Sequence, residues 1–187
     1  MTALSLWLGL IYLVSEILLT LTRQSRSKTG TKQDRSTLGM IWLMIAISIA
    51  AGVFVAQNFQ VAALPYGRMF SGAGVVLFVA GLALRWWAII TLGRFFTVDV
   101  TIEKDHELVE RGPFRVVRHP SYTGVLLAFV GLALSLQNWA ALLVILLPIG
   151  AAFIHRMNVE EEALSRALGP RYAEYMKRTK RLVPFVY

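Results

Sequence analysis

Long apolar runs separated by short polar loops constrain the fold of this 187-residue chain more than any other feature. Three of them cover residues 2–22, 38–60 and 69–92, and each is close to the ~20 residues that a helix needs to cross a bilayer. With 56% hydrophobic residues and a mean hydropathy of +0.59, the chain exceeds the apolar share of ordinary soluble domains. These runs predict an all-α, polytopic integral membrane protein with a single domain over residues 1–187.

Two shorter apolar runs follow, at residues 121–136 and 140–154. Each is short for a span, so we expect a helical hairpin that dips in and returns, which gives about five membrane helices with the last two paired. The charged residues 156–179 predict a C-terminal helix that breaks or kinks at Gly169-Pro170. The apolar residues 182–187 are expected to fold back on the domain. The domain would thus hold three spans in 1–92, and a loop, the hairpin and this helix in 93–187.

Basic residues predict the orientation in the membrane. Residues 23–36 carry five basic residues against one acidic residue, which places this loop in the cytoplasm. Residues 93–119 and 156–187 would then lie on the same side, and the turn at 64–67 would lie outside. The formal net charge of +8 could indicate nucleic acid in a soluble protein, but beside apolar spans it is better explained by membrane lipids with anionic headgroups. We therefore expect no nucleic-acid partner.

A few polar or small residues interrupt the apolar runs. Glu16 is interpreted as lying near the headgroups or facing a partner helix, and a buried carboxylate with a functional role is the alternative. Arg85 is interpreted as extending to the interface within an aromatic belt, and support of a functional site is the alternative. Ser71, Gly74 and Gly81 offer positions where a second helix can approach closely.

The polar stretch from His106 to Gly124 is the best candidate for a functional site. Gly112-Pro113 predicts a turn, and Pro120 suits the first turn of a helix, where its missing N–H costs nothing. Arg118, His119 and Tyr122 should therefore cluster where a polar loop meets a membrane helix. Such a position suits polar chemistry beside lipid.

A second candidate lies downstream. Arg156 and Glu160 are four residues apart on a predicted helix and share one face, as in a surface ion pair. Their place directly after the hairpin should turn them toward the loop that holds His119. The three histidines lack metal-ligand spacing and the chain has no cysteine, so no metal site is expected. No glycine-rich nucleotide loop is present either.

The order of these segments resembles the isoprenylcysteine carboxyl methyltransferase family, relatives of the phospholipid N-methyltransferases. The resemblance covers the chain from Leu92 onward. The residues that carry it are His106-x-Leu108-Val109, Gly112, Phe114 and Arg118-His119-Pro120-Ser121-Tyr122-x-Gly124, then Arg156-x3-Glu160-Glu161, Leu164, Gly169, Tyr172, Tyr175 and Leu182-x-Pro184-Phe185.

This resemblance implies a membrane methyltransferase that uses S-adenosyl-L-methionine and releases S-adenosyl-L-homocysteine. It implies catalytic roles for Arg156 and Glu160, facing a lipophilic or lipidated acceptor that arrives from the bilayer. It also implies cofactor contacts at His106, Glu107, Leu108, Val109, Phe114, His119, Pro120, Ser121 and Tyr122. The active site would face the cytoplasm.

The chemistry of the acceptor leaves alternatives open. A carboxylate is ionised at pH 7 and needs alignment rather than a base, which an arginine fork oriented by Glu160 supplies. An amine would have to lose a proton, which Glu160 or Glu161 could accept. Carboxyl methylation of an isoprenylcysteine-like acceptor is the first interpretation. The alternatives are N-methylation of a phospholipid or small amine, S-methylation of a thiol, and a membrane scaffold or transport accessory without enzymatic activity.

Overall fold

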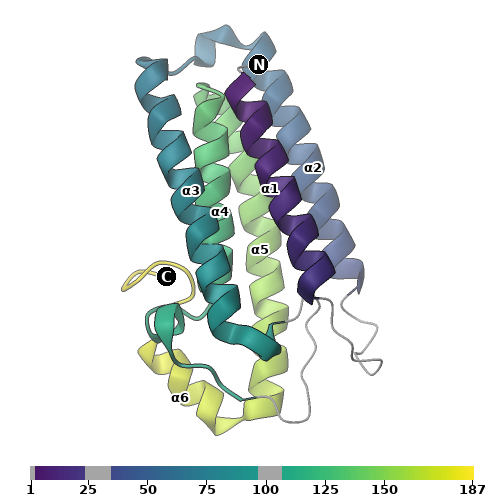
Figure 1. Ribbon diagram of the computed structural model, residues 1–187, viewed down its shortest axis with the longest axis vertical. Helices are drawn as coiled ribbons and strands as arrows, with labels where there is room; N and C mark the ends of the chain where they lie inside the picture. Colours follow the sequence, from purple (N-terminus) through teal and green to yellow (C-terminus); the bar gives the residue numbers. More distant parts are fainter. Residues whose placement is uncertain (1–2, 24–34, 97–106) are drawn as a thin grey trace.

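The computed structural model describes residues 3–23, 35–96 and 107–187, which form a bundle of helices. Its main elements are α1 (Ala3–Arg23), α2 (Arg35–Asn58), α3 (Gly67–Leu92), α4 (Pro120–Ser135), α5 (Trp139–Leu168) and α6 (Pro170–Arg178), with short 3-10 turns at Gln60–Ala62, Gly93–Phe95 and Gly112–Arg115. Helices α1 to α5 run side by side along the long axis, and α6 lies at one end (Figure 1). The predicted all-α, polytopic architecture is confirmed.

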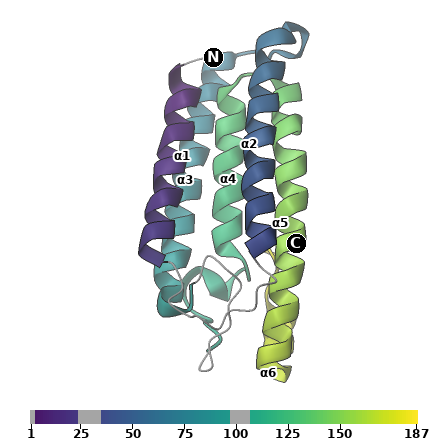
Figure 2. The same ribbon diagram turned by 90° about the vertical axis from the view of Figure 1, so that its right-hand side faces the viewer.

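The helices divide by length into spans and one shorter central helix. Within the described residues, α1, α2, α3 and α5 are long and apolar enough to cross a membrane. The shorter α4 has 16 residues, most of them buried, and Figure 2 shows it between α1 and α2 in the middle of the bundle. The protein is thus an integral membrane protein in which neighbouring helices enclose the short arm of the hairpin.

Small residues let α3 and α4 approach until their backbones touch. A methyl group placed on Gly81 would lie 2.5 Å from the carbonyl oxygen of Gly124. One placed on Gly124 would lie 2.6 Å from the carbonyl oxygen of Gly81. Close helix contact at small residues is therefore confirmed for Gly81. It brings Arg85, one turn further along α3, next to the start of α4.

The turn between α4 and α5 reaches the end of the bundle opposite to α6. There the backbone N–H of Leu64 donates to the carbonyl of Gln137 at 2.8 Å, and Asn138 Nδ2 donates to the carbonyl of Phe59 at 2.9 Å. Asn138 Oδ1 also accepts from the N–H of Ala141 and caps α5. The hairpin therefore runs the full height of the bundle, because its turn is bonded to the connection between α2 and α3.

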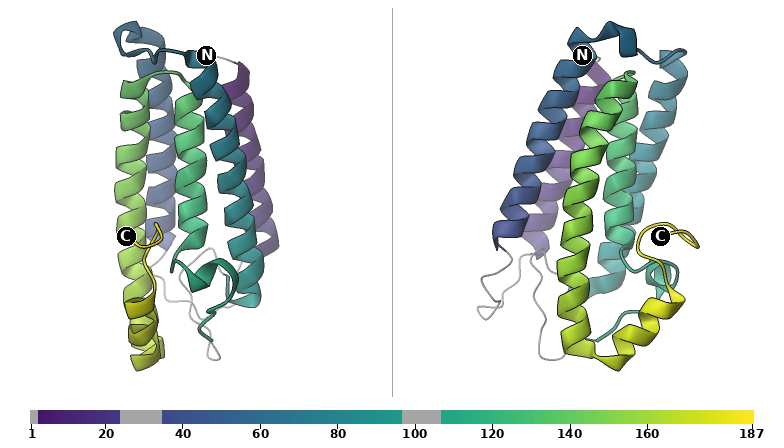
Figure 3. Two further views of the ribbon diagram at one scale, coloured as in Figure 1. Left: turned by 90° about the vertical axis from the view of Figure 1, so that its left-hand side faces the viewer. Right: turned by 180° about the vertical axis from the view of Figure 1, so that it is seen from behind.

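Helix α5 is longer than the sequence suggests. It continues without a break through residue 155, where the apolar arm was expected to end, and stops at Gly169, whose φ is +54°. Thirty residues at 1.5 Å per residue make a helix of about 45 Å, longer than the ~30 Å hydrocarbon core. Figure 3 shows α5 extending past the ends of α1 and α2 toward α6. The predicted break at Gly169-Pro170 is confirmed, and residues 156–178 are helical apart from Gly169, but the expected start near residue 156 is wrong because α5 continues through it.

The segment after α6 returns to the start of α4. The N–H groups of Arg118 and His119 donate to the carbonyls of Lys180 and Arg181, at 2.7 and 3.0 Å. Leu182 is buried, so this part folds back as predicted. Residues 183–187 instead remain exposed.

Candidate active site

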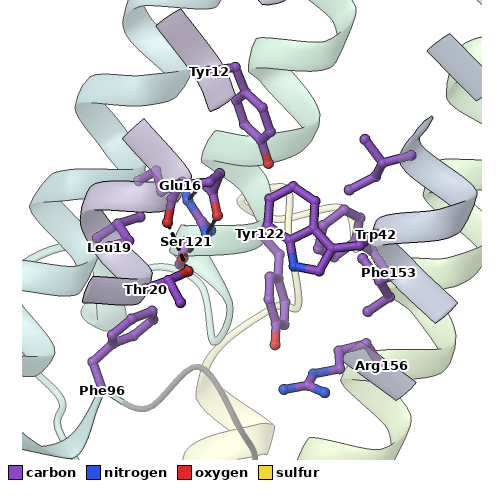
Figure 4. Close-up of a pocket in the computed structure, with 13 residues that line it drawn as sticks. Tyr12, Glu16, Leu19, Thr20, Trp42, Phe96, Ser121, Tyr122, Phe153 and Arg156 are labelled. Atoms are coloured by element: carbon purple, nitrogen blue, oxygen red, sulfur yellow. Dashed lines mark hydrogen bonds and ion pairs between the residues drawn. The ribbon is translucent and has the colours of Figure 1, made fainter. Parts of the chain in front are cut away.

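A pocket lies inside the bundle near its polar end. Its volume is about 640 Å³, including the space at its open mouth. All five long-axis helices contribute to its wall, as do residues just beyond α3; the lining residues are Tyr12, Glu16, Leu19, Thr20, Ile41, Trp42, Ile45, Arg85, Phe96, Ser121, Tyr122, Phe153 and Arg156. Figure 4 shows Trp42 and Phe153 on one side and Glu16, Thr20 and Ser121 on the other. The pocket therefore combines apolar walls with a few polar groups, as small-molecule sites do.

Tyr122 connects this pocket to the polar loop. Its hydroxyl donates to Glu160 Oε2 at 2.7 Å and also interacts with Arg156. Its ring stacks on the His119 ring with a centroid distance of 5.5 Å and contacts Phe153 at 5.2 Å. The structure thus brings Arg156 and Glu160 to the loop of His119. That proximity was predicted from the position of the pair after the hairpin.

Arg156 is the positively charged residue that α5 contributes to the pocket wall. It is 4% exposed, and Figure 4 shows its guanidinium below the Tyr122 hydroxyl. Glu160 lies one turn further along α5, with its Oε2 3.9 Å from His119 Nδ1. A buried guanidinium beside apolar walls is suited to bind a carboxylate on a lipophilic molecule.

Glu161 contacts three side chains at the polar end of the bundle, two arginines and one histidine. Its Oε1 accepts from Arg118 Nε at 2.9 Å and lies 3.1 Å from His119 Nε2. Its Oε2 accepts from Arg181 Nη2 at 2.6 Å and from Arg181 Nε at 3.1 Å. In the sequence, Glu161 was part of the family pattern and a possible base, and its position directly after Glu160 was the available signal for this structural role. The structure shows that it fixes His119 and Arg118 between α5 and the segment after α6.

Charge and burial shift the acid–base behaviour of the groups around α6. Burial alone would lower the pKa of the Arg181 guanidinium, but hydrogen bonds to Tyr187 and Glu161 raise it. Burial, followed by the nearby carboxylates of Glu161 and Glu160, raises the pKa of Tyr172. Burial likewise raises the pKa of Tyr175, whose hydroxyl donates to the carbonyl of Phe114 at 2.7 Å. These side chains therefore keep their neutral phenols and charged guanidinium at physiological pH.

A second buried ion pair lies within the spans. Glu16 Oε1 and Oε2 lie 2.6 and 2.7 Å from Arg85 Nε and Nη2, in a bidentate arrangement. Arg85 Nη1 donates to Ser121 Oγ at 3.0 Å. The interpretation of Arg85 as an interfacial side chain is wrong, because Gly81 lets α4 approach and Glu16 neutralises the charge inside the bundle. Glu16 does face a partner helix, and the alternative that Arg85 supports the site is the one that fits.

The residues predicted to contact the cofactor lie along the path from the loop into α4. His106 is outside the described residues. Glu107 is exposed, and Leu108 and Val109 are half-buried. Phe114 is buried, and its carbonyl accepts from Tyr175 of α6; the last four predicted contacts open α4, where His119 is the N-cap and Pro120 is the first residue. These cofactor contacts stay predictions, because the position of these residues near one another does not by itself show that they bind the cofactor.

One buried hydroxyl indicates that the polar end has capacity for a polar ligand. The Tyr172 hydroxyl is buried and has no hydrogen-bond partner among the described residues. It lies close to the carboxylates of Glu160 and Glu161. Since buried hydroxyls are normally paired, this group suits the polar amino-acid portion of S-adenosyl-L-methionine. The donor set present therefore fits the cofactor that the resemblance implies.

Comparisons with known proteins agree with this arrangement. The sequence model of the isoprenylcysteine carboxyl methyltransferase (ICMT) family matches residues 74–166. Protein-S-isoprenylcysteine O-methyltransferase B of Arabidopsis thaliana is 33% identical over 144 residues, which cover 76% of this chain and 73% of the relative. Methyltransferase A of the same plant is 36% identical over 118 residues, or 62% of this chain and 60% of the relative.

A solved structure gives the same result for the fold. The eukaryotic intramembrane Ras methyltransferase ICMT superimposes with a TM-score of 0.64 at 27% identity, over 78% of this chain and 52% of that protein. The chain thus spans about half the length of this solved relative. The extent and identity of the match to methyltransferase B show that the chain belongs to the isoprenylcysteine carboxyl methyltransferase family.

Proposed function

We propose that this chain transfers a methyl group from S-adenosyl-L-methionine to the carboxylate of an isoprenylcysteine-like acceptor that reaches the pocket from the bilayer. The observation that carries the proposal is the buried Arg156 in the wall of a largely apolar pocket, joined through Tyr122 to the segment of the predicted cofactor contacts. The whole chain, residues 1–187, would act as one methyltransferase domain. The two plant relatives described above are protein-S-isoprenylcysteine O-methyltransferases.

The apolar and polar walls of the pocket would each bind a different part of the acceptor. Leu19, Ile45 and Phe153 offer surface for an isoprenoid chain. Arg156 would hold the acceptor carboxylate through two parallel hydrogen bonds, as a guanidinium fork favours. Glu160 would keep Tyr122 in place through the hydroxyl contact and thereby orient the arginine. Enclosure by the bundle would exclude water from the reacting groups.

Each reactant would be positioned by a different part of the chain. When bound, S-adenosyl-L-methionine supplies a methyl group on a sulfonium that departs as a neutral thioether. His119, Ser121, Tyr122 and the other predicted contacts would hold it at the polar end, and Tyr172 would add a hydroxyl. The acceptor carboxylate needs no general base at pH 7, so these residues would act by alignment. The charge pattern supports placing this end in the cytoplasm.

The test is methyl transfer from labelled S-adenosyl-L-methionine by the protein in lipid vesicles. The acceptors are N-acetyl-S-farnesylcysteine, a long-chain amine and a long-chain thiol. We expect label on the farnesylcysteine as a methyl ester that base releases as methanol. The amide of the same farnesylcysteine, which lacks the carboxylate, should remain unlabelled. Labelling of the amine or the thiol in place of the carboxylate would overturn carboxyl methylation while retaining methyl transfer.

A further inference from the structure

Residues 183–187 form an apolar turn outside the bundle that the proposed reaction does not use. Phe185 is 92% exposed and Val186 is 74% exposed. Val183 and Tyr187, at the two ends of the turn, are each exposed by more than two fifths. A contiguous apolar surface of this kind on a protein marks a region that contacts something other than water.

The turn is held in a defined shape. The N–H groups of Leu182 and Val183 donate to the carbonyl of Tyr187, both at 2.7 Å, and the N–H groups of Val186 and Tyr187 donate to the carbonyl of Val183, both at 3.1 Å. Phe185 sits at the apex with a φ of +65°, the left-handed region that a bulky side chain rarely adopts. The backbone thus holds an aromatic ring away from the protein at a conformational cost, which points to a role for the exposed ring.

The position of the turn along the bundle indicates which part of the membrane it would contact. Thr123 Oγ1, in the first turn of α4, donates to the carbonyl of Leu182 at 2.8 Å. Val125, two residues later in α4, is already fully buried in the apolar core. Figure 1 shows the end of the chain beside the lower part of the bundle, at about the height where α1 ends. The turn therefore lies level with the end of the apolar span α1, where the boundary between the hydrocarbon core and the headgroups is expected.

The composition of the turn and its surroundings fits that boundary. Four of the backbone N–H groups in residues 182–187 are bonded within the turn and Pro184 has none, which limits the cost of leaving water. Residues 170–187 carry five basic residues against a single acidic residue, and Lys180 lies exposed just before the turn. Basic groups beside an apolar, aromatic tip match an anionic headgroup layer over acyl chains.

We propose that residues 183–187 insert into the lipid interface, with Phe185 and Val186 in contact with acyl chains. The segment directly before the turn is paired with Arg118 and His119, so the membrane surface would hold the segment that covers the polar end of the candidate active site. This proposal does not depend on the acceptor or on methyl transfer, because it rests on the exposure, shape and height of the turn.

The test uses the absence of cysteine from the chain, which makes each introduced cysteine unique. Phe185→Cys, and separately Val186→Cys, would carry a nitroxide spin label in full-length protein reconstituted in vesicles of phosphatidylcholine and phosphatidylglycerol. Collision with oxygen, which concentrates in lipid, is compared with collision with a water-soluble nickel chelate. Val76→Cys on the exposed surface of α3 is the lipid reference, and Glu174→Cys on exposed α6 is the water reference.

Labels at 185 and 186 are expected to resemble the label at 76, with an oxygen-to-chelate collision ratio severalfold higher than at 174. Ratios at both positions equal to that at 174 would place the turn in water and overturn the proposal. Protection of both positions from oxygen and chelate alike would show a protein neighbour, such as a second copy of the chain, and would also overturn it. None of these outcomes depends on methyl transfer, so the proposed function is tested separately.

Discussion

Glu16 and Glu161 are two buried carboxylates with different numbers of partners. Glu16, within the spans, gives both oxygens to the single guanidinium of Arg85. Glu161, on the part of α5 beyond the apolar arm, serves two guanidinium groups and the His119 ring. An ion pair surrounded by lipid must be close to neutral, whereas water and headgroups screen surplus positive charge at the membrane surface. The single pairing of Glu16 within the apolar spans and the shared pairing of Glu161 beyond them fit this difference in surroundings.

The two carboxylates also differ in what they position. Glu161 fixes Arg118 and His119, and so the polar end where the cofactor is predicted. Glu16 fixes Arg85, whose remaining contact is Ser121 in the wall of the pocket. Glu161 lies within the family match at residues 74–166, and Glu16 lies outside it. We therefore expect Glu161 to act on the cofactor side of the site, and the Glu16–Arg85 pair to act on the pocket wall proposed for the acceptor.

The largest effect is expected for Glu161→Gln, which removes the charge that Arg118 and Arg181 share. Breaking a buried ion pair costs about 3–5 kcal/mol, and two cations lose their partner here. We expect a large drop in the thermal unfolding midpoint and loss of S-adenosyl-L-homocysteine binding by titration calorimetry. Glu162→Gln is the matched control, since its exposed pair with Arg166 contributes about 0–1 kcal/mol. Wild-type cofactor affinity in Glu161→Gln would refute the cofactor-side assignment.

Glu16→Gln should destabilise the protein by about 3 kcal/mol, at the lower end of that range, because only Arg85 loses its partner. Cofactor affinity should change less than in Glu161→Gln, because Ser121 is the one predicted cofactor contact that Arg85 is described as bonding, while the KM for the acceptor rises as the pocket wall loosens. The double variant Glu16→Met/Arg85→Met should recover most of the stability, since replacing a whole buried pair with apolar residues is often neutral. Thermal unfolding in detergent micelles measures the stability of the single and the double variant. A double variant as unstable as Glu16→Gln would show that charge pairing does not stabilise the packing of α1.

Arg156→Ala tests the arginine that is proposed to bind the acceptor carboxylate. Loss of a charge-assisted contact of about 1.5–3 kcal/mol should lower the rate by roughly tenfold to 150-fold, at ~1.4 kcal/mol per decade. Cofactor affinity should be retained, and Arg156→Lys should rescue poorly because an ammonium lacks the planar fork. Initial rates with farnesylcysteine are the measurement, and His155→Ala, an exposed neighbour on α5, is the control. A fully active Arg156→Ala would leave the acceptor carboxylate without its proposed partner.

Tyr122→Phe should have the smallest effect. It removes the hydroxyl contact to Glu160, a partly solvated carboxylate, which is worth about 1.5 kcal/mol at the lower end for charged acceptors, and keeps the ring against His119 and Phe153. We expect a rate reduction of about tenfold at most, with the unfolding midpoint nearly unchanged. Glu160→Gln should be similarly mild for a carboxylate acceptor. For an amine acceptor, Glu160→Gln would instead be more severe than Arg156→Ala, and rates of the three variants decide between them.

Much of the fold follows from hydropathy and small residues. The first three spans, the helix start at Pro120 and the close contact at Gly81 were all predictable, because each depends on local composition or spacing. The unbroken course of α5 was not, since a helix can pass from apolar to charged sequence without any local signal. What ends it is Gly169, a residue that adopts the left-handed region at little cost.

The site was predictable where its residues are close in sequence. Arg118, His119 and Tyr122 lie on one short segment, and helical spacing links Arg156 to Glu160. The pairing of Glu16 with Arg85 joins residues 69 positions apart, and no periodicity specifies which residue of another helix a carboxylate meets. The bond from Arg181 to Glu161 likewise depends on the backbone path after α6. Long-range polar partners therefore came only from the structure.

The backbone contact between Gly81 and Gly124 has a mechanical consequence. Helices that touch at this distance cannot separate or slide without losing the contact or colliding, so α3 and α4 form a rigid frame. The pocket borders this frame but takes its remaining wall from α1, α2 and α5. Any widening that admits a bulky lipid must then come from those outer helices. The frame keeps Arg85 and Ser121 in register throughout, so the acceptor would meet a fixed surface behind a movable one.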